Sequence, residues 1–186
     1  MSNSSSVAAD PSTLYPKTLY PRLGALIEQA QTSASSAQAL PVLGMVYPCD
    51  ALSMEAVAAI QQQGIARLVL VGPREPMLRA AHAAGVDLAA YECVHADAAE
   101  PQSAAACATR WAREGRLNAL MKGSLHTDEL MSAVVNKDSG LRTGKRISHA
   151  FVFDLPRYHK LLALADCVVN ISPDLKTKRD VLGNAV

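Results

Sequence analysis

From residue 40 onward, short apolar runs alternate with longer segments in which apolar and polar positions recur at helical spacing. Short apolar runs between turn signals indicate strands, and longer amphipathic segments indicate helices. The predicted strands are 41–47, 66–72, 87–94 and 117–123. The predicted helices are 50–64, 74–85, 98–115 and 125–136. Because strands that alternate with helices of this length form βαβ units, the pattern predicts an α/β fold with a parallel sheet.

Local signals support these boundaries. Asp50 stands at the start of one predicted helix, and Gly64 and Gly85 stand at the ends of two helices. An Asp before a helix and a Gly after it are typical capping residues. The run 66–72 is continuously apolar rather than alternating, which predicts a strand buried on both faces.

The pattern differs at both ends of the chain. Residues 19–31 predict a short helix, and the Ser- and Ala-rich stretch 32–39 predicts a loop. After residue 140 a basic loop leads into an apolar run at 147–156, a further predicted strand at 165–173 and the start of a helix after Pro173. We therefore expect a disordered tail at 1–13, a first α/β domain at 14–146 and the beginning of a second α/β domain at 147–186. No Gly or Pro closes the last helix, so we expect this second domain to be truncated.

Composition narrows the class of protein. The chain has 186 residues and a net charge of +1, so it gives no sign of a nucleic-acid or membrane partner. The first residues, MSNSSSVAADPST, lack the basic and apolar regions of a secretory signal. Four cysteines stand far apart without a CxxC pair, which favours reduced, mostly buried thiols in a cytoplasmic protein and no metal site.

The basic loop GLRTGKRISH, residues 140–149, invites comparison with a nucleotide-binding P-loop. Its spacing from Gly140 to Gly144 is one residue short of that motif, and Lys145 is followed by Arg146 instead of Ser or Thr. The loop also runs from a helix into a strand, whereas a P-loop runs from a strand into a helix. We reject a nucleotide-binding P-loop, and with it a P-loop nucleoside triphosphatase, on these grounds. The loop remains a candidate anion site through Arg142, Lys145 and Arg146, or else a solvated surface loop.

A second candidate for anion binding is the stretch MKGSLHT, where the fourth predicted strand meets the next helix. Ligands of parallel sheets bind at this carboxyl edge, and a helix N-terminus favours anions. Lys122 supplies a charge, Gly123 permits a close approach of the backbone to a ligand, and His126 can donate a hydrogen bond. Ser124 and Thr127 are both candidates to cap the helix. Each residue also has a purely structural interpretation, as a helix cap or an exposed polar side chain.

Cys49 lies at the end of the first predicted strand and could act as a nucleophile. No base is placed near it in the sequence pattern. A structural thiol, with Asp50 capping the following helix, is therefore the preferred interpretation.

Four segments together resemble the phosphate acetyltransferase / phosphate butyryltransferase family, over about residues 40–186. These segments are GIARLVLVGPREPMLRAAHAAGVDL, EGRLNALMKGSLHTDELMSAV, GLRTGKRISHAFVFDLP and ADCVVNISPDLKTKRDVLGNAV. LMKGSLHT and GLRTGKRISH are the most specific of them, and they look closer to the butyryltransferase-like branch.

The resemblance implies a phosphate acyltransferase, in which acyl-CoA and phosphate interconvert with acyl phosphate and CoA. It implies coenzyme A as a substrate, no metal or other cofactor, and a homodimer. It also implies a fold similar to isocitrate and isopropylmalate dehydrogenases. The residues that would bind the substrates are Lys122, Gly123, Ser124, His126, Thr127, Arg142, Lys145 and Arg146. Members of the family are longer, so we expect the catalytic base beyond Val186 and little activity from this portion alone. The alternative hypothesis is a non-catalytic phosphate- or CoA-binding module.

Overall fold

The structure is a computed structural model of the chain, and it describes residues 19–96 and 100–186. The described residues form two compact units. The first unit is Ala30–Arg142, and the second combines residues 19–29 with Thr143–Val186. The expected tail at 1–13 lies outside the described residues, and the expected domain limits at 14–146 and 147–186 stay predictions.

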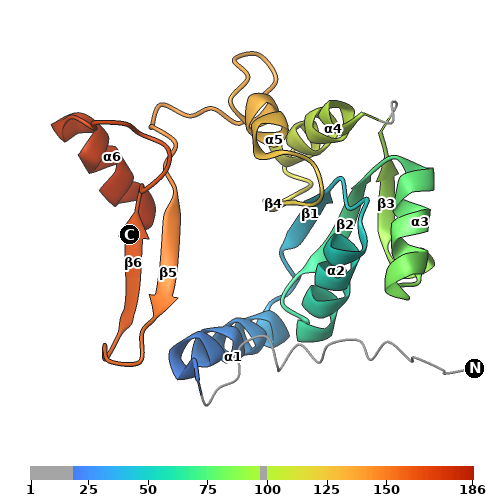
Figure 1. Cartoon of the computed structure of the whole chain (residues 1–186), viewed down its shortest axis with the longest axis horizontal. Helices are drawn as coiled ribbons and strands as arrows, with labels where there is room; N and C mark the ends of the chain where they lie inside the picture. The colour runs from blue at the N-terminus through green and yellow to red at the C-terminus, as the bar shows by residue number, and fades with distance from the viewer. Residues whose placement is uncertain (1–18, 97–99) are drawn as a thin grey trace, which may run out of the picture. The chain divides into compact units, whose positions relative to one another are not determined.

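The first unit is built on a four-stranded parallel sheet (Figure 1). Its strands are β1 (Val42–Val46), β2 (Arg67–Gly72), β3 (Glu92–His95) and β4 (Ala119–Lys122), in the order β3-β2-β1-β4. Every pair in this sheet is parallel, with Val46 opposite both Val71 of β2 and Lys122 of β4. The α/β class and the parallel sheet are therefore confirmed.

Helices cover both faces of this sheet because its central strands are apolar on both sides. They are α2 (Ala51–Gln63), α3 (Arg74–Ala84), α4 (Pro101–Arg113) and α5 (Thr127–Val134). In β2, Leu68 and Leu70 join a buried cluster with residues of α2 and α3, whereas Val69 and Val71 join a second cluster with residues of α4. This alternation is the two-residue period of a strand, and it confirms that β2 is buried on both faces.

Two features of this unit differ from the expectations. The predicted strand 87–94 begins with a short 3₁₀ helix, η2 (Leu88–Ala90), because the Asp87 carboxylate accepts a hydrogen bond from the Ala89 N–H at 3.0 Å; β3 starts only at Glu92. The expected loop at 32–39 is largely helical, since α1 spans Pro21–Ser36. Within it, the Ser35 hydroxyl donates to the Gln31 carbonyl at 2.9 Å, so this serine satisfies its polar group on the helix itself.

The second unit contains an antiparallel pair, β5 (Ala150–Asp154) and β6 (Leu161–Ala165), followed by α6 (Leu175–Ala185). The strand expected at 165–173 is wrong, because β6 occupies the preceding run and the chain turns at Asp166, whose φ is 59°. The Asp166 carboxylate then accepts hydrogen bonds from the Val169 and Asn170 N–H groups, which form a turn instead of a strand. The predicted start of the last helix is confirmed, since Asp174 caps α6 through the Thr177 N–H at 2.7 Å.

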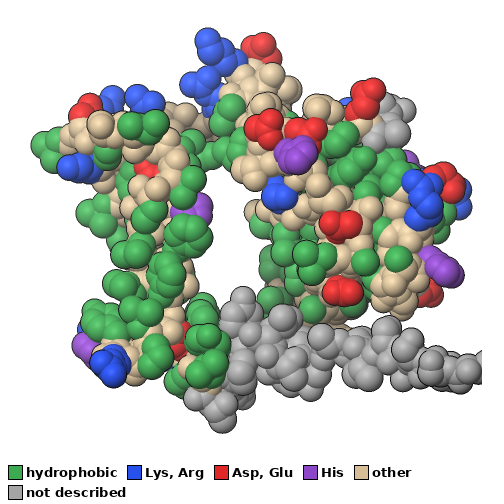
Figure 2. Space-filling view, in the orientation of Figure 1, with side chains coloured by type: hydrophobic (Ala, Val, Ile, Leu, Met, Phe, Trp, Pro, Cys, Tyr) green, Lys and Arg blue, Asp and Glu red, His purple; other side chains and the backbone are tan. Residues whose placement is uncertain are grey.

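Apolar side chains remain exposed on the β5–β6 pair. Phe151, Val152 and Phe153 are all classed as exposed, and Leu164 opposite Phe151 is exposed as well. Figure 2 shows hydrophobic side chains along this pair of strands. The second unit therefore presents an apolar surface that the described residues leave uncovered.

Candidate functional site at the carboxyl ends of β1 and β4

The carboxyl ends of β1 and β4 lie side by side, since Val46 pairs with Lys122 in the sheet. The chain leaves β1 through Tyr47–Asp50 and leaves β4 through Gly123–His126, so these two loops start at the same edge. We call these two segments together the loop crossing. Its position confirms the expectation that MKGSLHT joins the end of the fourth strand to the next helix.

Gly123 lies directly against the end of β1. Its N–H donates to the Val46 carbonyl at 2.8 Å. A Cβ on Gly123 would stand 2.6 Å from the carbonyl oxygens of both Val46 and Tyr47, which is too close for any side chain. The sequence predicted a close approach of this backbone to a ligand; the structure shows a close approach to the end of β1.

Ser124 ties the crossing together with three hydrogen bonds. Its hydroxyl donates to the Tyr47 carbonyl at 2.9 Å and accepts from the Cys49 N–H at 3.1 Å. Its own N–H donates to the same Tyr47 carbonyl at 3.0 Å. Ser124 thus links the two loops and does not cap a helix.

The residue that caps α5 is His126, so the expectation of Ser124 or Thr127 at this position is wrong. The His126 N–H donates to Glu129 Oε2 at 2.7 Å, and Gln102 of α4 donates to Glu129 Oε1 at 2.8 Å. Asp128 and Glu129 place negative charge in the first turn of α5, where the helix dipole favours it. Thr127 is the first helical residue, and its side chain is exposed beside them.

Lys122 provides the positive charge of the loop crossing. Its ammonium donates to the carbonyl oxygens of Gly123 at 3.1 Å and Leu125 at 2.7 Å, which holds it against the β4–α5 loop. The side chain is nevertheless exposed, as is that of His126. Lys122, His126 and Thr127 are therefore the expected site residues at this edge that are exposed, whereas Ser124 is half-buried.

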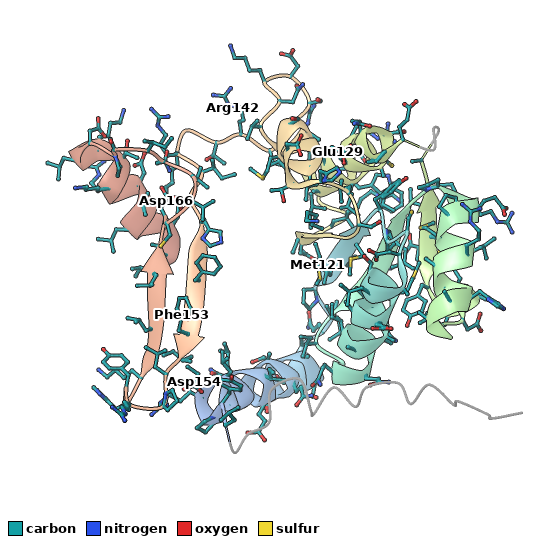
Figure 3. The ribbon with its side chains drawn as sticks, viewed as in Figure 1. Met121, Glu129, Arg142, Phe153, Asp154 and Asp166 are labelled. Carbon is teal, nitrogen blue, oxygen red and sulfur yellow. The ribbon has the colours of Figure 1, made fainter. Side chains whose placement is uncertain are left out.

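Tyr47 is a residue of the crossing that sequence reasoning missed. Its φ of 57° is left-handed, a conformation that bulky side chains rarely adopt. Burial raises the pKa of its phenol, and the nearby Cys49 and Glu129 raise it further. Glu129 was missed as well, although its place three residues after the cap is the sequence signal of a capping box. Figure 3 labels Glu129 in α5 and Met121 in β4, the two elements that the β4–α5 loop joins.

Cys49 behaves as a structural thiol. Burial raises its pKa to about 12, the Asp50 carboxylate adds to the rise, and Arg79 partly opposes it. A thiol with this pKa is protonated near neutral pH and is a poor nucleophile. Asp50 caps α2 by accepting from the Ser53 N–H at 2.8 Å, as the sequence predicted. These observations support the structural interpretation of Cys49.

The basic loop is divided between the two units. Arg142 ends the first unit, after a turn in which Asn136 Oδ1 accepts from the Asp138 and Ser139 N–H groups. Lys145 and Arg146 belong to the second unit. All three cationic side chains are exposed, and Arg142 is labelled in Figure 3.

Arg146 lies at the N-terminus of α6. It lines a shallow groove there together with Asn170, Asp174 and Thr177. The Thr177 N–H lowers the pKa of Asp174 most, and the positive charge of Arg146 adds a smaller lowering. This helix N-terminus is already occupied by the Asp174 carboxylate.

The sequence of this chain is similar to those of known proteins. The chain is 41% identical over 154 residues to a phosphate acetyltransferase of Rhizobium meliloti, which covers 83% of this chain and 48% of that protein. It is 36% identical over 135 residues to a phosphate butyryltransferase of Clostridium acetobutylicum, covering 72% of this chain and 44% of that protein. No protein-family model matches the chain.

A solved structure supports the fold. The branched-chain phosphotransacylase of Enterococcus faecalis V583 matches 78% of this chain and 50% of its own, with a TM-score of 0.59 and 20% identity. At that identity the likeness concerns the fold alone.

The chain spans about half the length of the relatives that it matches. Both acetyl- and butyryltransferases occur among these relatives, so the closer likeness to the butyryltransferase branch stays a prediction. Over most of its length, this chain resembles one portion of the phosphate acetyltransferase / phosphate butyryltransferase family, as its sequence motifs indicated.

Proposed function

We propose that the chain is a portion of a phosphate acyltransferase, which exchanges an acyl group between coenzyme A and inorganic phosphate. The observation that carries this proposal is the 41% identity over 154 residues to a phosphate acetyltransferase. The loop crossing adds support, because it lies at the edge of a parallel sheet where ligands commonly bind.

In the direction of thioester synthesis, the sulfur of CoA attacks the carbonyl carbon of an acyl phosphate. A C–S bond forms, the bond between the carbonyl carbon and the bridging oxygen of the phosphate breaks, and phosphate leaves with the electron pair. The proton of the CoA thiol passes to a base, which we assign to the part of the relatives outside the matched half. This chemistry needs cations for the phosphate oxygens and donors for the carbonyl oxygen.

We assign these cations and donors to the exposed residues among the expected site residues. Lys122, His126 and Thr127 would contact the reacting phosphate at the loop crossing. Gly123 and Ser124 would act indirectly, because their polar groups already bond to β1. Arg142, Lys145 and Arg146 would bind phosphate groups of either substrate. The two guanidinium groups can do so in bidentate fashion, and the Lys145 ammonium can do so as a point charge.

Other properties belong to the same proposal. Coenzyme A acts as a substrate, and no metal or other cofactor takes part. The complete enzyme is a cytoplasmic homodimer with a fold similar to the isocitrate and isopropylmalate dehydrogenases. No helix in the described residues is long and apolar enough to cross a membrane.

The test is an acyltransferase assay on two proteins. One is this chain, and the other is this chain joined to the unmatched part of the Rhizobium meliloti relative. Acetyl-CoA or butyryl-CoA is incubated with phosphate, and free thiol is followed. Activity in the joined protein alone would support an acyltransferase portion. Activity in neither protein, together with binding of CoA by this chain, would favour the binding module, which the partial coverage of the relatives also allows.

A further inference from the structure

Strand β1 ends at a tyrosine whose backbone is left-handed. Among the described residues, three that are not glycine have a positive φ: Tyr47, Asp166 and Ser172. Asp tolerates this conformation because its short polar side chain can bond locally, whereas a large aromatic side chain gains no such help. A bulky residue held in this region indicates that its surroundings enforce the conformation, and such residues often lie at functional sites.

The surroundings of Tyr47 do enforce it, through both of its backbone polar groups. Its N–H donates to the Val71 carbonyl at 2.7 Å, which extends the pairing of β1 with β2 by one residue. Its carbonyl oxygen accepts three hydrogen bonds: from the Cys49 N–H at 2.9 Å, the Ser124 N–H at 3.0 Å and the Ser124 hydroxyl at 2.9 Å. This one carbonyl therefore organises both loops of the crossing.

The ring of Tyr47 adds a second anchor. It packs against the buried cluster that contains Val46, Val71 and Leu125. Leu125 is 2% exposed and stands between Ser124 and His126 in the β4–α5 loop. Glycine would adopt the same backbone conformation more easily, but it would give up this packing. The packing of the ring and the hydrogen bonds of the backbone together explain why a tyrosine stands at this position.

We infer that Tyr47 is a positioning residue, which sets the path of the β4–α5 loop and so the direction of Lys122, His126 and Thr127 toward the ligand. This inference rests on the proposed function for the identity of the ligand, a phosphate group. Tyr47 acts through Ser124 and the loop backbone and makes no contact with phosphate itself.

The first measurement is hydrogen–deuterium exchange over residues 122–127, which requires no ligand. In the wild-type chain the Gly123 and Ser124 N–H groups are bonded to the carbonyls of Val46 and Tyr47, so their exchange is slow. Tyr47→Ala removes the ring that supports this geometry, and we expect exchange there to rise about tenfold or more. Tyr47→Phe keeps the ring, and its exchange measures separately what the phenol hydroxyl contributes.

A matched control is Tyr91→Ala. Tyr91 is also half-buried, but it packs against the cluster on the opposite face of the sheet and has an ordinary φ of −120°. This variant loses an equal ring without touching the loop crossing, so exchange over 122–127 should not change. Should Tyr47→Ala fail to fold, Ser124→Ala removes two hydrogen bonds of the same crossing from the other loop and should also speed exchange.

The second measurement is the dissociation constant for inorganic phosphate, obtained by calorimetry on the same variants. We expect Tyr47→Ala to raise it about tenfold and Tyr91→Ala to leave it unchanged. Unchanged exchange in Tyr47→Ala, or faster exchange with an unchanged dissociation constant, would overturn the inference. If the wild-type chain bound no phosphate, the proposed function would fail, while the exchange comparison would still decide whether Tyr47 holds the loop.

Discussion

At the scale of single residues, Gly123 has little freedom to change. The atoms that a Cβ would meet are backbone oxygens of Val46 and Tyr47 at 2.6 Å, and backbone atoms within a sheet cannot rotate away as a side chain can. We therefore expect Gly123→Ala to lower the free energy of unfolding by about 2 kcal/mol, within the range for overpacked sites.

Urea unfolding of the purified variant measures this loss. Gly144→Ala is the matched control, because a Cβ on Gly144 meets nothing within 4 Å and its φ is not positive. Equal stability of the two variants would mean that the β4–α5 loop can move away from β1, which would contradict the tight crossing described above.

Individual residues also show which features of the structure could be predicted from the sequence and which could not. Asp50, Gly64 and Asp174 were recognisable because a cap acts on its immediate neighbours along the chain. The left-handed backbone of Tyr47 was not recognisable, because it depends on Ser124, 77 residues away. The three bonds of Ser124 were hidden for the same reason, and its sequence context suggested a helix cap.

At the scale of elements, β5 and α1 are joined by a contact between residues that lie far apart in the sequence. Asp154 ends β5, and its Oδ2 accepts from the backbone N–H groups of Arg22 at 2.7 Å and Leu23 at 3.1 Å. Its Oδ1 accepts from the Arg22 guanidinium at 2.7 Å. The carboxylate thus caps the N-terminus of α1 from 132 residues away, as the label in Figure 3 helps to locate.

This contact predicts an acid-sensitive element. Burial alone would raise the pKa of Asp154, but the hydrogen bonds from the Arg22 side chain and from the Leu23 and Arg22 N–H groups outweigh it and lower the pKa. A lowered folded-state pKa means that the stabilisation is fully present above the unfolded pKa of about 3.9. It is lost as the pH falls below that value.

Asp154→Asn should therefore lower the melting temperature at pH 7. Between about pH 4 and pH 2, the melting temperature of the variant should fall less than that of the wild type. Thermal melts of the wild type and the variant across this range measure the effect. Asp138→Asn serves as the control, since the Asp138 side chain is exposed and the hydrogen bonds to Arg113 and Asn136 involve its backbone carbonyl and N–H. Parallel pH profiles for the wild type and Asp154→Asn would show that the carboxylate contributes no stability.

The strands of the parallel sheet could be predicted from the local pattern of apolar residues. The elements of the second unit could be predicted in this way only in part. Strands β1, β2 and β4 lie within the predicted runs because each run is largely apolar, and β1 and β2 have the continuous apolar character of buried parallel strands. The strand β6 was misplaced because Val168 and Val169 favour strands locally, yet Asp166 binds the following N–H groups and turns the chain. The local preference for a strand was overridden by a side chain that accepts hydrogen bonds from the same backbone N–H groups.

At the scale of the whole molecule, the two units differ in how they bury apolar residues. The first unit encloses two clusters, one on each face of its sheet. The second unit has a two-stranded pair with exposed aromatic residues, where Phe151 is 44% and Phe153 is 37% exposed. A two-stranded pair alone is marginally stable in water, and contiguous exposed apolar surface favours association.

We therefore expect the purified chain to self-associate as its concentration rises, through this surface of the second unit. Phe151→Lys places a charge on the surface, beside Leu164 on the neighbouring strand, and should reduce association because burial of that charge is costly. Light scattering over a concentration series measures the mean mass. Leu52→Lys is the control, because Leu52 is 74% exposed on α2 of the first unit. If both variants, or neither, changed the mean mass, the association would arise elsewhere on the chain, and the exposed face of β5 would have no part in it.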